Sequence, residues 1–202
     1  MHPLDVLRVQ WQGAWASALA LWSRFTKLSE PRWCLDPGED MREGLSDSFA
    51  MIRLHDQAVV VSLWQIANKQ LEKFAVEVLA HEIGHHIYVP GNLLEHGRML
   101  ARMRRGLPER EQYAPLIANL YADLLINDRL QRQAGLDMLG VYRALRVPEQ
   151  RPLWKLYLRT YEILWSQPRG TLAELPLEAS LEADAGLAAR LVRSFARDWL
   201  DG

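Results

Sequence analysis

The stretch of residues 70–88, QLEKFAVEVLAHEIGHHIY, constrains the fold more than any other part of the chain. Its apolar residues recur at steps of three and four, which predicts one amphipathic helix packed against a core. Two histidines, His81 and His85, occupy positions i and i+4 of this helix. They are therefore about 40° apart in projection and one turn apart along the axis, so both imidazoles can reach one ion.

Glu82 completes a His-Glu-x-x-His pattern, in which the two histidines hold zinc and the glutamate acts as general base on a zinc-bound water. Neutral imidazoles leave most of the ion's positive charge in place, which lowers the pKa of the bound water toward about 7. Glu82 can then accept a proton from that water as it attacks a carbonyl carbon. A surface helix with solvated side chains would show the same five letters, so the assignment depends on a third ligand.

Length and composition set the class of protein. A chain of 202 residues is long enough for one domain with a sizeable core. The net charge of −1 gives no general attraction to nucleic acid or to an anionic membrane, so we expect neither as a partner. Because Cys34 is the single cysteine, no intrachain disulfide can form, and we expect a buried apolar thiol in a reducing compartment. The chain shows neither a secretory signal nor an apolar run of about 18 residues, so we expect a cytoplasmic protein.

Outside the predicted helix 70–88, the hydrophobic pattern of the sequence predicts mostly helices and one β-hairpin. Two β-prone runs, 49–54 and 58–64, flank His55-Asp56-Gln57 and predict the hairpin. Its outer strand could pair with an extended peptide substrate or could simply cover the core. Residues 29–48 are rich in proline, glycine and acidic residues and predict a loop. Helices are expected, by their hydrophobic spacing, at 3–28, 93–105, 109–134, 137–146, 151–167 and 178–201.

The third ligand must come from beyond the break at Val89-Pro90-Gly91. The metzincin subclass is excluded, because the positions where it needs glycine and histidine hold Tyr88 and Gly91. His86 is about 100° round the helix from His85 and points away. His96, soon after the break, stays open as an alternative ligand.

The predicted helix 109–134 offers a stronger candidate in Asp123. Asn119, Asp123 and Asn127 fall at i, i+4 and i+8 and form one polar stripe through an apolar surface. A buried carboxylate needs a partner, and a metal cation would be that partner. We therefore predict Asp123 as the third ligand, with Asn119, Asn127 and Asp128 as residues that support or could replace it. The alternative is a stripe that faces water or caps a neighbouring loop.

With these motifs in place, the sequence resembles a predicted metallopeptidase domain that occurs in bacteria with von Willebrand factor A modules and MoxR-type ATPases. The segment NLYADLLINDRL is similar to the Ala-Ala-Asp-x-x-Ile-Asn helix of that family. The strand 59–63, Asn68 and the His-Glu-x-x-His helix follow the family's order, so the resemblance covers roughly residues 48–132.

This resemblance implies a zincin-like core with Asp123 as a metal ligand and Asn127 nearby. The Asp-x-Ser-x-Ser motif of a von Willebrand factor A module is absent, so residues 140–202 cannot be such a module. A von Willebrand factor A partner would therefore be a separate chain.

Together these features predict one α+β domain, mostly α, over residues 1–202. It would comprise an N-terminal helix and loop (1–47), a zincin-like core (48–135) and C-terminal helices (136–202). The expected function is Zn²⁺-dependent hydrolysis of peptide bonds in a protein or peptide substrate. Two alternatives stay open: a non-catalytic zinc-binding module that docks an ATPase or a von Willebrand factor A partner, and a regulator that cleaves one repressor.

Overall fold

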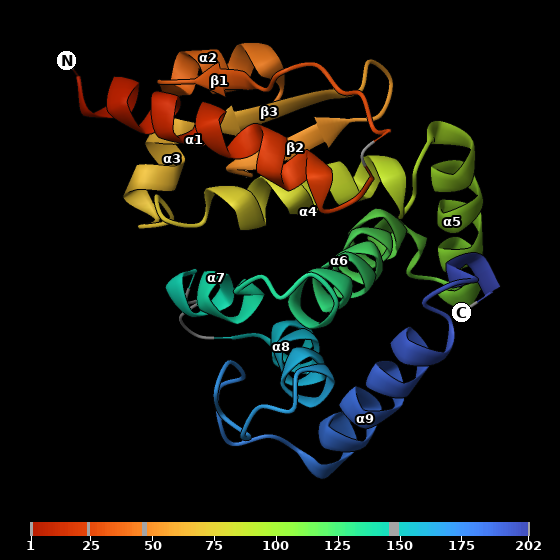
Figure 1. Ribbon diagram of the computed structural model, residues 1–202. Coiled ribbons are helices and arrows are strands. Elements are labelled where there is room, and N and C mark those ends of the chain that lie inside the picture. The colour runs from red at the N-terminus through yellow and green to blue at the C-terminus, as the bar shows by residue number, and fades with distance from the viewer. Residues whose placement is uncertain (1, 24, 46–47, 146–149, 202) are drawn as a thin grey trace. The chain divides into compact units, whose positions relative to one another are not determined.

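The computed structural model describes residues 2–23, 25–45, 48–145 and 150–201 of the chain. It is an α+β structure and mostly helical, as predicted, and its strands form a three-stranded sheet (Figure 1). The chain forms two compact units, which we describe separately. The first unit comprises Met1–His96 with Leu136–Leu145, and the second comprises Gly97–Gly135 with Arg146–Gly202. The units cut across the three predicted segments, and the single domain stays a prediction.

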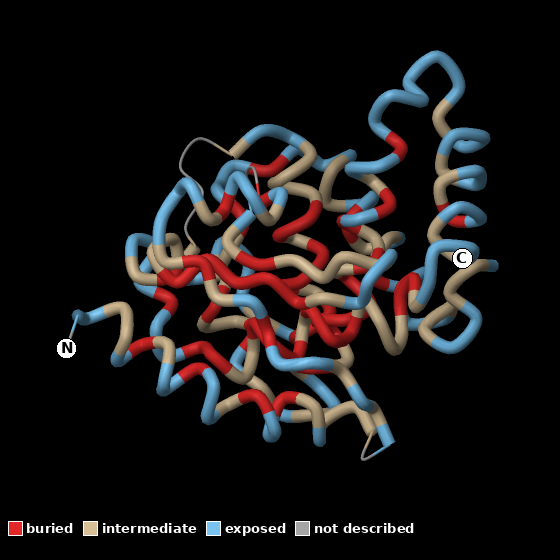
Figure 2. The backbone as a smooth tube through the Cα atoms, turned by 90° about the horizontal axis from the view of Figure 1, so that it is seen from above, coloured by how far each residue is buried: buried red, intermediate tan, exposed pale blue. Residues whose placement is uncertain are grey.

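The sheet of the first unit has the strand order β1-β3-β2. Strands β2 (Ala50–Arg53) and β3 (Ala58–Ser62) pair antiparallel, which confirms the predicted hairpin. The central strand β3 is nearly completely buried, because its consecutive valines have neighbours on both faces. Figure 2 shows the backbone coloured by burial, with the buried residues in red. The predicted second run was too long at its end, where Leu63–Asn68 forms helix α3.

The prediction of a loop over residues 29–48 was wrong in its middle. Strand β1 (Arg32–Cys34) pairs parallel with β3, and α2 (Pro37–Glu43) follows it. Asp36 caps α2 by accepting a hydrogen bond from the backbone N–H of Glu39, and proline occupies the first turn. Gly44, at φ 83°, ends the helix in the left-handed conformation that favours glycine.

A buried carboxylate joins α2 to the end of β3. Asp40 Oδ2 accepts hydrogen bonds from Ser62 Oγ at 2.9 Å, from Trp64 Nε1 at 2.8 Å and from Gln65 Nε2 at 2.9 Å. Three donors offset much of the cost of burying a charge. The network therefore fixes the start of α3 against the strand that precedes it.

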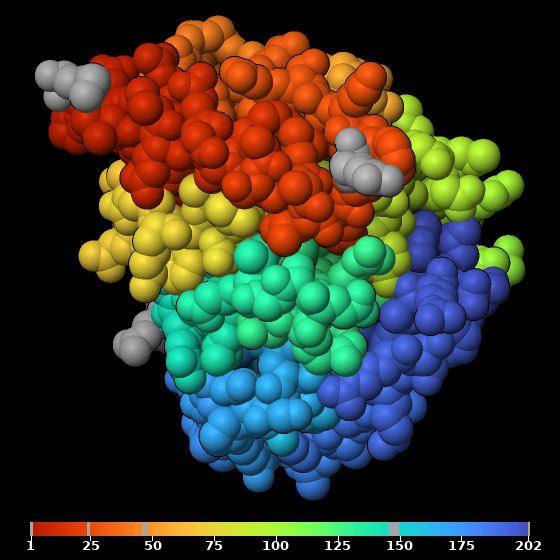
Figure 3. All heavy atoms as spheres, viewed as in Figure 1, coloured from red at the N-terminus to blue at the C-terminus, as the bar shows by residue number. Residues whose placement is uncertain are grey.

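Helix α1 (Pro3–Ala20) packs one apolar face against α4 (Ala75–Ile87). Trp11, fully buried, donates from Nε1 to the carbonyl oxygen of Glu72 at 3.0 Å. Trp22, just past the helix, donates from Nε1 to the carbonyl oxygen of Ala80 at 2.7 Å. The opposite face of α1 lies at the surface, in the red region of Figure 3. The helix is shorter than the predicted 3–28 because the chain turns after Ala20.

Helix α4 also begins later than predicted, at Ala75 and not at residue 70. Gln70, at φ 57°, adopts a left-handed conformation that interrupts the helical path after α3. Leu71 and Phe74 are nevertheless buried, so their apolar spacing reflects core packing without helical backbone. The short helix α7 (Met138–Ala144) completes this unit, and the N–H of Asp137 before it lies 3.4 Å from Glu77 Oε1.

The second unit is built from helices, and most of their ends lie close to the predicted ends. Helix α6 begins at Ala114, later than the predicted residue 109, and Pro115 lies in its first turn. The last helix is shorter than predicted, because the chain leaves α9 after Ser194. The elements are α5 (Leu93–Gly106, whose first turn is counted with the first unit), η1 (Glu111–Tyr113), α6 (Ala114–Arg132), α8 (Pro152–Leu164), α9 (Ala179–Ser194) and η2 (Trp199–Asp201).

A second buried carboxylate organises the turn after α8. Glu162 is completely buried, and its Oε1 accepts from the backbone N–H groups of Leu172 at 2.6 Å and Ala173 at 2.9 Å. Its Oε2 accepts from Arg159 Nη1 at 3.0 Å. The carboxylate thus provides the partners that this buried stretch of backbone requires.

Among the residues that the structure describes, no helix has both the length and the apolar character needed to cross a bilayer.

Candidate metal centre

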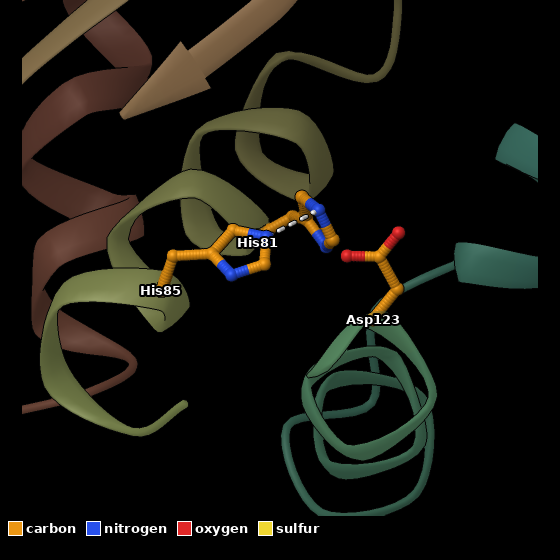
Figure 4. Close-up of side chains that lie close together, drawn as sticks. All are labelled: His81, His85 and Asp123. Carbon is orange, nitrogen blue, oxygen red and sulfur yellow. Dashed lines mark hydrogen bonds between the residues drawn. The ribbon is translucent and has the colours of Figure 1, made fainter. Parts of the chain in front are cut away.

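The two histidines of the His-Glu-x-x-His pattern lie side by side on α4. Their Nε2 atoms are 3.3 Å apart, and the ring centroids are 4.8 Å apart with the ring planes at 89° (Figure 4). The helix produces this arrangement, because residues at i and i+4 project from one side, one turn apart. The spacing in the sequence predicted that the two imidazoles lie together, and they do; that His81 and His85 share one ion stays a prediction.

The distance between the two nitrogens fits a shared zinc ion. Zinc–nitrogen bonds of about 2.0–2.1 Å at a tetrahedral angle place two ligand nitrogens about 3.3–3.4 Å apart. Direct hydrogen bonding between the rings would need one Nε2 to carry a proton. The question is therefore which nitrogen of His85 is protonated.

The backbone after α4 determines which ring nitrogen of His85 carries the proton. Its Nδ1 lies 3.0 Å from the carbonyl oxygen of Val89. Because a carbonyl can only accept, we assign the proton to Nδ1, and Nε2 then carries the lone pair of the ring. The turn is closed by Gly91, which has φ 76° and donates its N–H to the His85 carbonyl oxygen at 2.9 Å. Sequence reasoning read this segment only as a helix breaker and missed its role in orienting the ring.

Glu82 is one of the few buried charged residues among those that the structure describes, with 6% of its surface exposed. It follows His81 directly on α4, so its carboxylate projects about 100° round the helix from that imidazole. A buried carboxylate differs from the solvated glutamate of an ordinary surface helix.

His86 and His96, the other two histidines considered from the sequence, have different surroundings from the pair. His86 is partly buried beside His85, and this burial lowers its pKa. His96 lies in the first turn of α5, where its backbone N–H donates to the carbonyl oxygen of Asn92 at 3.0 Å.

The polar stripe of α6 divides into two parts. Asn119 Nδ2 donates to Asp123 Oδ2 at 3.2 Å, on the exposed side of the helix. Asn127 is 1% exposed, and its Nδ2 donates to the hydroxyl of Tyr161 at 2.8 Å, which in turn shares a 2.8 Å hydrogen bond with Tyr157. Asn127 therefore belongs to the core of the second unit, whereas Asn119 contacts the predicted ligand directly.

Asp128, predicted as a reserve ligand, already has a cationic partner. Its Oδ1 accepts from Arg132 Nε at 2.7 Å, and its Oδ2 accepts from Nη2 of the same guanidinium. This two-pronged pairing raises the pKa of Arg132 and occupies both carboxylate oxygens. Asp128 is thus a poorer metal ligand than Asp123.

Cys34, the predicted buried thiol, is 1% exposed and packs with Leu45, Val60 and Met51. Burial raises its pKa to about 12, and the nearby Asp40 carboxylate adds to the effect. A thiol with this pKa stays protonated and is a poor metal ligand at neutral pH.

No protein-family model matches the chain, and no curated protein or solved structure is similar to it at a significant level.

Proposed function

We propose that this chain is a zinc-dependent peptidase, in which His81, His85 and Asp123 hold the ion and Glu82 is the general base. The observation that carries the proposal is the 3.3 Å separation of the two Nε2 atoms, with Nδ1 of His85 engaged by the Val89 carbonyl. Two imidazole nitrogens at this spacing would supply half of the ligands of a tetrahedral zinc site.

Asp123 is the best third ligand among the described residues. It lies in the middle of the polar stripe of α6, where the sequence predicted it, and Asn119 Nδ2 donates to its Oδ2 at 3.2 Å. Two neutral imidazoles and one carboxylate would leave a net charge of +1 on a zinc site, which keeps the ion Lewis-acidic.

The chemistry follows from the residue types. When bound, zinc would act as a Lewis acid toward water and toward the carbonyl of the scissile peptide. Glu82 accepts the proton that the water loses as its oxygen bonds to the carbonyl carbon. The same carboxylic acid then gives this proton to the nitrogen of the leaving amine, so Glu82 ends the cycle ionised.

The sheet supports a peptide as the substrate class. Since β3 lies between β1 and β2, the outer edge of β2 has no strand partner among the described residues. Helix α4 packs against β2, so this edge belongs to the same unit as the histidine pair. An extended peptide could add to such an edge through main-chain hydrogen bonds.

Metal analysis beside peptidase assays on Glu82→Gln and Asp123→Ala tests the proposal. The wild-type chain should bind one zinc and cleave casein or a quenched-fluorescence peptide library. Glu82→Gln should keep the zinc and lose cleavage, whereas Asp123→Ala should lose the zinc. Asp184→Ala, on the exposed side of α9, is a matched control that should change neither property.

Two results would overturn the assignment. A wild-type chain that binds no zinc removes the metal site altogether. A chain that holds zinc but cleaves nothing, with Glu82→Gln indistinguishable from it, supports the non-catalytic zinc-binding module. In that case, pull-down with a MoxR-type ATPase or a von Willebrand factor A protein would be the informative measurement.

A further inference from the structure

The backbone hydrogen-bonding groups of β2 alternate between its two edges. The N–H of Ser62 donates to the carbonyl oxygen of Phe49 at 2.8 Å, which makes these residues a hydrogen-bonded pair of the antiparallel ladder. Because such pairs alternate with pairs that are not hydrogen-bonded, the register of β2 and β3 turns the N–H and C=O of Met51 toward β3. Ala50 and Ile52, on either side of Met51, therefore turn their N–H and C=O to the outer edge of the sheet.

The outward groups of Ala50 are occupied by a side chain of the same unit. Ser48 Oγ donates to the carbonyl oxygen of Ala50, and the N–H of Ala50 donates to the same hydroxyl at 3.4 Å. No side chain among the described residues engages the outward groups of Ile52 in this way. Ser48 is itself held in place, because its carbonyl oxygen accepts from Gln65 Nε2 at 3.2 Å and that amide also donates to the buried Asp40.

We propose that Ser48 is a specificity-determining residue for an extended peptide that adds to the edge of β2. Its hydroxyl takes the place of a neighbouring strand at Ala50, so Ile52 is the residue left to pair with the main chain of a peptide. The peptide is thereby fixed at one position along the strand and cannot slide by two residues. This inference deepens the proposed function and rests on it for the choice of a peptide as the ligand.

Binding of a fluorescent peptide to the full chain, measured by anisotropy, tests the role of Ser48. The probe alternates threonine and valine, which favour an extended conformation, and a chelator keeps the chain metal-free so that no probe is cleaved. Ser48→Ala should bind the probe about 2–10-fold more tightly than wild type, because the groups of Ala50 become available to it. Ser48→Thr keeps the hydroxyl and should bind as wild type does. Ser29→Ala, at an exposed serine of the same unit, is the matched control.

Amide hydrogen exchange shows where on the strand the probe binds. In wild type, the probe should slow exchange at the N–H of Ile52 and not at that of Ala50, whereas in Ser48→Ala it should slow both. The N–H of Met51 faces β3 and should not respond. Ile52→Pro removes the outward donor and should weaken binding about 2–10-fold, since an edge strand tolerates proline where the nitrogen faces away from the ladder. The exchange measurement tests the position of the probe even if Ile52→Pro does not fold.

The outcomes separate this role from the proposed function. If the probe slows exchange at neither Ala50 nor Ile52 in wild type and in Ser48→Ala, this edge takes no peptide and the proposal is overturned. Equal affinities of wild type and Ser48→Ala refute the role of Ser48. If Ser48→Ala self-associates in size-exclusion chromatography and binds no more probe, Ser48 shields the edge from a second copy of the chain and the proposal is wrong. A chain that binds no zinc but shows the expected exchange pattern refutes the proposed function and supports the role of Ser48.

Discussion

The indole nitrogen of Trp22 lies 2.7 Å from the carbonyl oxygen of Ala80, the residue directly before His81. The Trp22 ring also lies 6.1 Å from the ring of Tyr88, centroid to centroid, at the other end of the segment that holds both histidines. One tryptophan thus contacts α4 on both sides of the histidine pair. It fixes the part of the helix whose geometry the proposed metal site requires.

We expect Trp22→Phe to lower the free energy of unfolding by about 1 kcal/mol, since one hydrogen bond is lost and most of the apolar contact is kept. It should also weaken zinc binding, because the segment around His81 loses its anchor. Urea denaturation and chelator competition measure the two effects. Trp11→Phe is the control: its indole bonds to Glu72, well before the histidines, so stability should fall without a change in zinc affinity. Equal zinc affinities in the two variants would contradict this role for Trp22.

The buried carboxylate of Glu162 should be the most sensitive single position of the second unit. Glu162→Ala leaves Arg159 and the N–H groups of Leu172 and Ala173 without this acceptor, and we expect a loss of about 3–5 kcal/mol in the free energy of unfolding. Glu162→Gln keeps one accepting oxygen and should cost less. Denaturant titration gives both values, with the exposed Glu174→Gln as a near-neutral control. A Glu162→Ala variant as stable as this control would show that the turn does not need the carboxylate.

Glu182 should contribute a pH-dependent part of the stability. Its hydrogen bonds from Arg159 lower the pKa of its carboxyl from the usual 4.5. Because the folded state favours the ionised form, this contribution is complete above about pH 4.5 and is lost as the pH falls through the lower, folded pKa. The stability difference between wild type and Glu182→Gln, measured in urea at a series of pH values, should therefore shrink in acid. A difference that stays constant from pH 7 to pH 3 would exclude this linkage.

Cys34 should be inert in the folded chain. Burial raises its pKa to about 12 from the usual 9.0, so almost no thiolate exists at pH 8. Alkylation followed by mass spectrometry should show modification only when denaturant is added. Since the unfolded thiol ionises at a lower pH than the folded one, stability should also fall as the pH rises above about 9. Rapid alkylation of native protein would show that the thiol is accessible.

The sequence predicted those parts of the fold that depend on local periodicity. The hairpin followed from two β-prone runs, and the helices of the second unit followed from hydrophobic spacing. The loop assigned to residues 29–48 failed because β1 is a short strand that forms only when β3 lies beside it. The capping signal of Asp36 and Gly44 was present and could have revealed α2. The early start assigned to α4 failed because Leu71 and Phe74 are buried without being helical.

In the candidate site, the spacing of His81 and His85 was predictable because a helix fixes it. The Val89 carbonyl was not, since a backbone atom leaves no mark in the sequence and its position depends on the turn around Gly91. The polar residues of α6 do recur along the helix as predicted, but they have different partners and different burial. Only tertiary contacts distinguish Asn127, bonded to a buried tyrosine, from Asn119, bonded to Asp123.

The first unit is assembled from two separate stretches of chain, and this order matters during synthesis. The helix that carries Asp123 leaves the ribosome before Leu136–Leu145, the stretch that completes the unit holding the histidines. A gene cut after His96 would therefore yield a fragment without α7, with Glu77 deprived of the Asp137 N–H. The first unit is therefore complete only once the chain has been synthesised as far as Leu145.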